Sequence, residues 1–264
     1  MSEAVASYRL RRHAIAFETI FRKEIRRFLR IWPQTLVPPA ITMTLYFVIF
    51  GNLIGSRIGT MGGHNYVDYI VPGLIMMSVI TSAYANVVSS FFGAKFQRFV
   101  EELLVAPVPS YIILAGFVTG GIVRGMLVAG MVTGVSLLFT DLHIAHPLIT
   151  LSVMLLAATL LSVAGFINAL YAKTFDDISI VPTFVLTPLT YLGGVFYSID
   201  LLPSFWQGVS RLNPILYMVN AFRFGMLGHS DISLSMAYAM MLLAIVVGIG
   251  WALWLLERGT GLRS

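Results

Sequence analysis

Runs of apolar residues longer than an ordinary globular core requires are the feature that most constrains this chain. A helix that crosses a bilayer needs roughly 20 mostly apolar residues. Six stretches approach or exceed that length: residues 35–53, 69–92, 111–139, 147–172, 178–196 and 234–256. Charged residues make up only 11% of the chain, against about 25% in a typical soluble domain. The sequence therefore predicts an all-α membrane protein with six transmembrane helices.

Prolines interrupt two of these stretches, Pro38 and Pro39 in the first and Pro182 and Pro188 in the fifth. Spanning helices tolerate proline where neighbouring helices satisfy the freed backbone groups, so both stretches are still expected to span. The basic segment before the first stretch is too long for a signal peptide, and no clear small-x-small cleavage site follows it. We expect the first span to be retained.

The positions of Lys and Arg predict the orientation. If the N-terminus lies inside, eight basic residues precede the first span and five lie in later inside segments, which makes 13 of the 17. The outer segments hold only Arg57, Arg211 and Arg223. Because basic residues gather on the cytoplasmic side, both termini are expected in the cytoplasm. Residues 1–34 form a cytoplasmic tail, and residues 35–264 form the transmembrane domain.

Residues 14–32 have the pattern of an amphipathic helix. Aromatic and aliphatic residues recur at three- and four-residue steps along one face, and basic residues form a second stripe. The residues singled out are Phe17, Phe21, Arg22, Arg26 and Arg30. A helix of this kind lies in the headgroup layer and contacts membrane lipid. The alternative is a basic tail that only sets the topology.

Residues 201–223 are apolar, but Pro203, Arg211 and Pro214 prevent one clean span. We expect two short helices that enter the outer leaflet, with Trp206 and Tyr217 at the interface. Backbone at that depth must be shielded by protein or face a water-filled cavity. The alternative is an ordinary hydrophobic outer loop.

Arg124 is the one formal charge near the middle of a predicted span. Its insertion costs on the order of 3 kcal/mol, so it is expected to face the bundle interior or an aqueous pathway. Small residues around it, among them Gly121, Gly125 and Ala129, allow close packing of helix backbones. A purely structural role for Arg124 is the alternative.

The sequence lacks the motifs that are typical of several classes of function. The chain has no cysteine, no G-x-x-x-x-G-K-[ST] phosphate loop and no acid or histidine within the predicted spans. No basic run carries interleaved aromatics, so no nucleic-acid partner is expected. The chain is therefore expected to be neither an enzyme nor a metalloprotein, and to hydrolyse no ATP itself.

The segment "KFQRFVEELLVAPVPS", residues 95–110, is a charged island between the second and third predicted spans. On one helix, Phe96, Phe99, Val100 and Leu103 would share an apolar face. The polar face would carry Lys95, Arg98, Glu101 and Glu102, and Pro107 and Pro109 would end the helix. Anionic headgroups would repel the paired acids, so this face is expected to contact a protein.

The run "RFVEELLVAPVPS" resembles the cytoplasmic coupling helix of ABC-2 type transport permeases. The run "GGVFYSIDLLPSFWQGVSRLNPILYMVNAFRFGMLG" is similar to the external re-entrant hairpin of that family, with Pro203, the pair Asn213–Pro214 and Arg223 in its motif positions. Two departures stand out. Phe99 replaces a frequent Thr, and Ser198–Ile199 stands where many members have proline.

The resemblance implies a homodimer of this chain with two ATP-binding-cassette ATPase subunits, which would hold ATP and Mg. This chain would bind no cofactor. The resemblance further implies a protein of the bacterial inner membrane that exports an amphipathic or glycan-type substrate across it. The competing hypotheses are a self-contained secondary transporter or channel, and a membrane-embedded enzyme. The sequence leaves open the substrate and the choice between a homodimer and a heterodimer.

Overall fold

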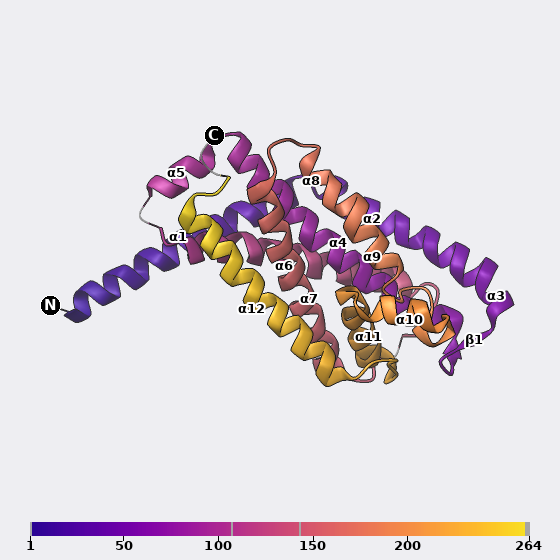
Figure 1. Cartoon of the computed structure of the whole chain (residues 1–264). Coiled ribbons are helices and arrows are strands. Elements are labelled where there is room, and N and C mark those ends of the chain that lie inside the picture. The colour runs from indigo at the N-terminus through magenta and orange to yellow at the C-terminus, as the bar shows by residue number, and fades with distance from the viewer. Residues whose placement is uncertain (1, 107, 143, 262–264) are drawn as a thin grey trace.

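The computed structural model describes residues 2–106, 108–142 and 144–261, and helices make up most of this part of the chain (Figure 1). Five helical runs within it are long and apolar enough to cross a membrane. They are α2 (Trp32–Tyr46) with the first residues of the π-helical segment η1 (Phe47–Ile54), α4 (Tyr66–Phe96), α6 (Ser110–Ser136), α7 (Pro147–Tyr171) and α12 (Leu234–Arg258). The all-α membrane architecture expected from the sequence is confirmed.

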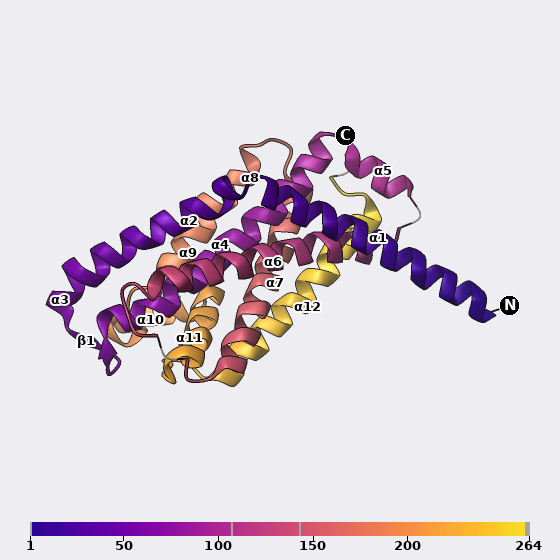
Figure 2. The same cartoon turned by 180° about the vertical axis from the view of Figure 1, so that it is seen from behind.

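The remaining elements lie before, between and beside these runs. They are α1 (Ser2–Arg30), α3 (Gly55–Ile58), α5 (Phe99–Val105), α8 (Asp177–Ile180), the π-helical η2 (Val181–Leu186), α9 (Thr187–Tyr191), the 3-10 turn η3 (Ile199–Leu201), α10 (Ser204–Arg211) and α11 (Pro214–Leu227). Two short antiparallel strands, β1 (Thr60–Met61) and β2 (His64–Asn65), form a hairpin after α3. Figures 1 and 2 show α5 and α10 at opposite ends of the bundle. We refer to these as the α5 end and the α10 end.

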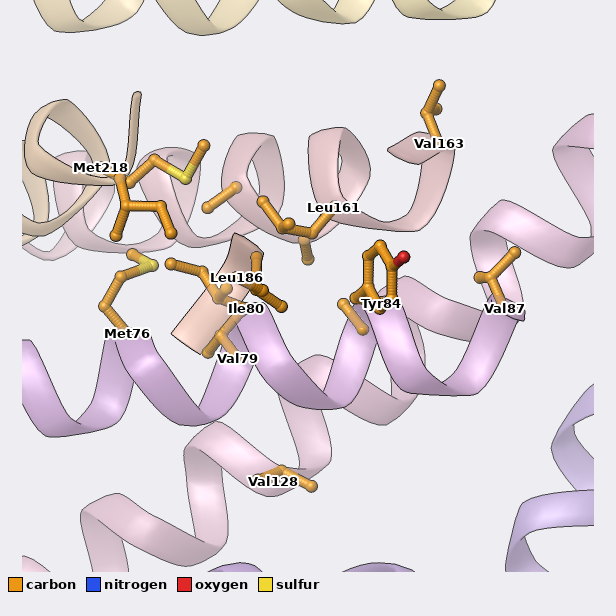
Figure 3. Close-up of a cluster of buried hydrophobic side chains, with 14 of the residues drawn as sticks. Met76, Val79, Ile80, Tyr84, Val87, Val128, Leu161, Val163, Leu186 and Met218 are labelled. Carbon is orange, nitrogen blue, oxygen red and sulfur yellow. The ribbon is translucent and has the colours of Figure 1, made fainter. Parts of the chain in front are cut away.

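Helix α4 forms the centre of the core. In its most apolar stretch 83% of the residues are buried, against 28% for α12. Met76, Ile80 and Tyr84 of α4 point toward α7 and α11, where Leu161 and Met218 lie (Figure 3). A helix that is buried on every side needs apolar residues on all of its faces, which explains why α4 shows no polar stripe.

Glycines on α6 form two rows that admit different neighbours. Gly116 and Gly120 lie against α1, where an added Cβ would meet Ile20 and Glu24. Gly121 and Gly125 lie against α4 and α7, and a Cβ at Gly121 would come within 2.6 Å of Val87 Cγ2. The expected close packing around Gly121 and Gly125 is therefore present within the chain, and Ala129 is buried on the same helix.

The predicted span over residues 178–196 takes a different form. Its helical part comprises α8, η2 and α9, which together run from residue 177 to 191 and are shorter than the 18 residues of a candidate span. Pro188 has no N–H to donate to the carbonyl of Phe184, and the Thr187 N–H bonds back to the Pro182 carbonyl in a widened turn. The count of six spans is thus not confirmed by helix length.

The two glycine rows can be tested by adding a single methyl group. Gly121→Ala should lower the thermal unfolding midpoint in detergent, because its Cβ would overlap Ser162 Oγ and Val87, and overpacking costs about 1–3 kcal/mol. Gly130→Ala on the same helix is the matched control, since nothing lies within 4 Å of its Cβ. Equal midpoints for both variants would contradict the packing of α6 described here.

Candidate functional site

The chain between α4 and α6 bends sharply at Arg98. Helix α4 ends at Phe96, and Arg98 adopts a left-handed conformation with φ of 63°, which is uncommon for a residue with a side chain. Helix α5 then begins at Phe99. The expectation that Lys95, Arg98 and Glu102 share one helical face is wrong, because Arg98 forms the corner between two helices.

Lys95 bonds inside the protein. Its Nζ donates to the carbonyl oxygens of Leu170 at 2.8 Å and Ala172 at 2.6 Å, at the end of α7. The last carbonyls of a helix lack partners within the helix and favour a cation. Lys95 therefore caps α7 and ties it to the end of α4, in place of the expected position on a partner-facing surface.

Helix α5 exposes its acids and only part of its apolar face. Val100 is buried and Leu103 packs against the core, whereas Phe99 is 48% exposed. Glu101 and Glu102 are exposed in the first turn, where negative charge favours the helix N-terminus. The expected apolar face is thus divided, and Phe99 and the acids remain open to a partner. Pro107 lies outside the described residues.

Helix α1 packs along α6 in the same direction. Tyr111 Oη lies 3.1 Å from His13 Nδ1, Ile20 lies against Gly116, and Glu24 lies against Gly120. The aromatic residues Phe17 and Phe21 are half-buried and stack at 5.9 Å between ring centroids, while Arg22, Arg26 and Arg30 are exposed. The packing of α1 on the bundle goes beyond what a basic tail that only sets topology requires.

A buried polar cluster joins α1 to α4. Glu24 is fully buried and accepts a hydrogen bond from Ser90 Oγ at 2.5 Å. Arg27 Nη2 lies 3.3 Å from the other Glu24 oxygen and donates to Asn86 Oδ1 at 2.8 Å. A buried carboxylate persists only when it is paired and hydrogen-bonded, so Ser90 and Arg27 together account for the burial of Glu24.

Sequence reasoning missed Glu24, although a signal was present. Ile20, Glu24 and Phe28 recur at four-residue steps, and this line is the face of α1 that is buried. The predicted apolar face follows Phe17 and Phe21, one position further along the helix than the buried line. An acid inside an otherwise apolar line was the available sign of a buried polar partner.

Arg124 lies one turn beyond Gly120 on α6. Its side chain is partly buried, and among the described residues its Nε has no hydrogen-bond partner. The cation therefore adds positive charge beside the Glu24 cluster. A role of Arg124 in an aqueous pathway and a purely structural role both stay predictions.

A cavity of about 450 Å³ opens between α1 and α5. Its walls come from both helices and from α6, and they combine apolar surface with one charge of each sign. The lining residues are Thr19, Ile20, Lys23, Phe99, Glu102, Leu103 and Phe117. The two segments that the sequence singled out at this end thus meet around one concave surface.

Arg223 is the central contact at the α10 end. It is fully buried on α11, and its Nη2 donates to the Gly194 carbonyl at 2.6 Å. Its guanidinium carbon stands 4.0 Å from the centroid of the Tyr69 ring on α4, a cation–π contact. Arg223, which the sequence places in the predicted re-entrant hairpin, thereby joins α11 and the segment after α9 to the start of α4.

The remaining hairpin residues set the local structure. Pro203 precedes α10, and Pro214 begins α11 after Asn213, whose Oδ1 accepts from Ile215 N and whose Nδ2 donates to the Leu189 carbonyl. Trp206 is half-exposed, as an interfacial residue would be. Tyr217 is not at an interface: it is buried, and its hydroxyl donates to the Arg211 carbonyl at 2.7 Å.

Long apolar helices around a buried α4, with an amphipathic helix packed on one end, define a multi-pass membrane protein. Among the described residues no group of three or more His, Cys, Asp or Glu side chains could hold a metal ion. The family model described as "ABC-2 type transporter" matches residues 15–227. The chain belongs to this family and is a membrane subunit of an ABC transporter.

Relatives support this assignment. The chain is 60% identical over 252 residues to "Inner membrane transport permease YadH" of Escherichia coli K12, which covers 95% of this chain and 98% of the relative. It is 26% identical over 207 residues to "Nodulation protein J" of Rhizobium leguminosarum bv. viciae, covering 77% and 79%. The similarity therefore extends along most of the length of each protein.

The Glu24 cluster makes a specific prediction about two neighbouring arginines. Arg27→Met should destabilise the protein strongly, because loss of one partner from a buried pair costs about 3–5 kcal/mol. Arg26→Met, on the exposed face one position away, should change stability by less than about 0.5 kcal/mol. Thermal unfolding of both variants in detergent checks this, and similar midpoints would show that Glu24 does not depend on Arg27.

Proposed function

We propose that this chain is the permease subunit of an ABC exporter in the bacterial inner membrane, driven by a separate ATPase. The observation that carries the proposal is the cavity between α1 and α5, with exposed Glu102 and Phe99 beside it. Family membership supplies the expectation of an ATPase, since the membrane subunits of ABC transporters work with one. The name of the 60% identical relative supports the inner membrane and transport.

We propose six crossings with both termini in the cytoplasm. Residues 175–196 run beside α4 for most of its length: Phe175 lies 5.0 Å from Phe92 near the end of α4, and the Phe196 carbonyl accepts a hydrogen bond from Tyr66 at its start. These contacts at both ends of α4 support a crossing by this segment, although its regular helix is short. The 13 basic residues of the inside segments support the orientation.

The length of α4 separates the coupling surface from the bilayer. Its 31 residues extend about 46 Å at 1.5 Å per residue, against about 30 Å for the hydrocarbon core. The surplus raises Arg98 and α5 above the membrane, where an ATPase can reach them. A displacement of α5 would move α4 through the bend at Arg98, and would move α7 through the hydrogen bond between Lys95 and the Leu170 carbonyl.

The assembly we propose contains two copies of this chain and two ATPases, which hold ATP and Mg. ATP-driven closure of the ATPases would press on α5 and α1 together, because both line the same cavity. Movement of α4 would then reach Arg223 and the α10–α11 hairpin at the outer end. The substrate class we propose is amphipathic or glycan-type, and it rests on the family alone.

Reversal of one exposed charge on α5 tests the coupling. In a complex purified with its ATPase, Glu102→Lys should leave the chain folded but weaken ATPase association and reduce transport-coupled ATP turnover at least several-fold. The reason is that like charges placed at an interface repel and suppress pairing. Co-purification and ATP hydrolysis measure the two effects separately.

Glu257→Lys is the matched control, because it makes the same charge change at an exposed site near the end of α12. Wild-type assembly and turnover in Glu102→Lys would overturn the role of α5. Transport that continues unchanged in cells lacking the ATPase would instead favour a self-contained secondary transporter.

The chain has no cysteine, so single cysteines report topology without background. In intact spheroplasts a membrane-impermeant maleimide should label Ser204→Cys on α10 at once. It should label Glu101→Cys on α5 only after the membrane is permeabilised. Labelling of both positions in intact spheroplasts would contradict the proposed six crossings.

A further inference from the structure

An apolar slot of about 240 Å³ opens between α6, α7 and α12, away from the coupling cavity. Leu114 and Val118 of α6, Val163 of α7 and Ile249 and Leu253 of α12 form most of its walls. All three helices are candidate spans. A slot with an almost wholly apolar lining between candidate spans has the character of an acyl-chain site.

A second cavity of about 250 Å³ has walls that include Arg12, His13 and Val108. One contact connects the two cavities: Tyr111, which lines the slot, places its hydroxyl 3.1 Å from Nδ1 of His13, which lines the second cavity. Arg9 and Arg11 are exposed on the same turns of α1. The second cavity therefore presents a basic rim to whatever occupies the slot.

The depth of the slot fits the boundary between headgroups and acyl chains. Tyr111 is the second residue of α6, and Leu114 and Val118 lie about 4–10 Å further along it. Tyr171, Trp251 and Trp254 are half-exposed at the same end of the bundle, and such aromatic residues mark membrane interfaces. The guanidinium carbon of Arg258 stacks 4.2 Å from the Trp254 ring centroid, which adds a cation at this level.

We propose that this double cavity binds one phospholipid with an anionic headgroup. The headgroup phosphate would contact Arg12 and His13, and one acyl chain would lie along Leu114, Val118 and Leu253. Charge complementarity selects the anionic headgroup, and the apolar slot selects an attached chain over a free phosphate. The bound lipid would fasten the start of α1 to α6 and α12. This proposal goes beyond the transport role and does not depend on the direction of transport.

Native mass spectrometry of the delipidated full-length chain tests the site with three probes: phosphatidylglycerol, phosphatidylcholine and glycerol 3-phosphate. One phosphatidylglycerol per chain should be retained, with phosphatidylcholine retained about fivefold less, the effect of about one favourable charge at an anionic lipid. Glycerol 3-phosphate, which lacks the acyl chain, should not bind.

Two variants test the headgroup contacts and the acyl-chain slot separately. The double substitution Arg12→Ala with His13→Ala should reduce phosphatidylglycerol retention about fivefold. Arg57→Ala, at an exposed site on α3 that lines neither cavity, is its control. Ala115→Phe should fill the slot and also reduce retention, whereas Leu243→Phe, on an exposed part of α12, should not.

Equal retention of both phospholipids would overturn the proposed headgroup contacts. Unchanged phosphatidylglycerol retention in Ala115→Phe would overturn the acyl-chain slot. Binding of glycerol 3-phosphate at the level of phosphatidylglycerol would identify a free-phosphate site in place of a lipid site. Size-exclusion profiles that match the wild type establish that each variant remains folded.

Discussion

The α5 end of the molecule depends on the packing of α1 into the first glycine row of α6. Gly116 and Gly120 remove the side chains that would hold α1 away, so Ile20 and Glu24 approach the α6 backbone closely. Glu24 becomes fully buried there and requires Ser90 and Arg27 as partners. A buried, paired carboxylate permits few alternative positions, because any shift leaves a charge unsatisfied. This cluster thus fixes α1, α4 and α6 as one unit.

The need to satisfy a buried charge also determines the packing at the α10 end. Arg223 is buried among α4, α11 and the segment after α9, and backbone carbonyls and the Tyr69 ring satisfy much of its guanidinium group. Each end of α4 is therefore attached to neighbouring segments by a buried cation or ion pair. The middle is attached mainly by apolar packing (Figure 3), with one hydrogen bond from Asn168 Nδ2 of α7 to Tyr84 Oη. Movement delivered through α5 can reach the hairpin because α4 connects these two fixed points.

The sequence predicted features that depend on local pattern. Apolar length located α4, α6, α7 and α12, and Pro203 and Pro214 located the starts of α10 and α11. Glycine spacing predicted the close contacts at Gly121 and Gly125. The shortened helix over residues 177–191 was not foreseen, because whether Pro182 and Pro188 bend, widen or shorten a helix depends on which groups can satisfy the freed carbonyls.

The residues whose contacts sequence reasoning did not foresee have partners far along the chain. Lys95 bonds to carbonyls 75 and 77 residues away, and Arg223 bonds to Tyr69 at a separation of 154. A charge at a helix end looks solvent-exposed when only its neighbours in sequence are considered. Glu24 was missed for the same reason, since Ser90 is 66 residues away. Local periodicity identified the surfaces of α1 and α5, but not which side chains remain exposed on them.

The central claim is that α5 receives the movement of a separate ATPase. Replacement of Phe99 by the photocrosslinker p-benzoylphenylalanine, in cells that produce the ATPase, tests it most directly, because this side chain is exposed on α5. The same replacement at Phe205, exposed on α10, is the control at the opposite end. The account predicts a covalent adduct with the ATPase from position 99 and none from position 205. An adduct from position 205, or none from position 99, would contradict it.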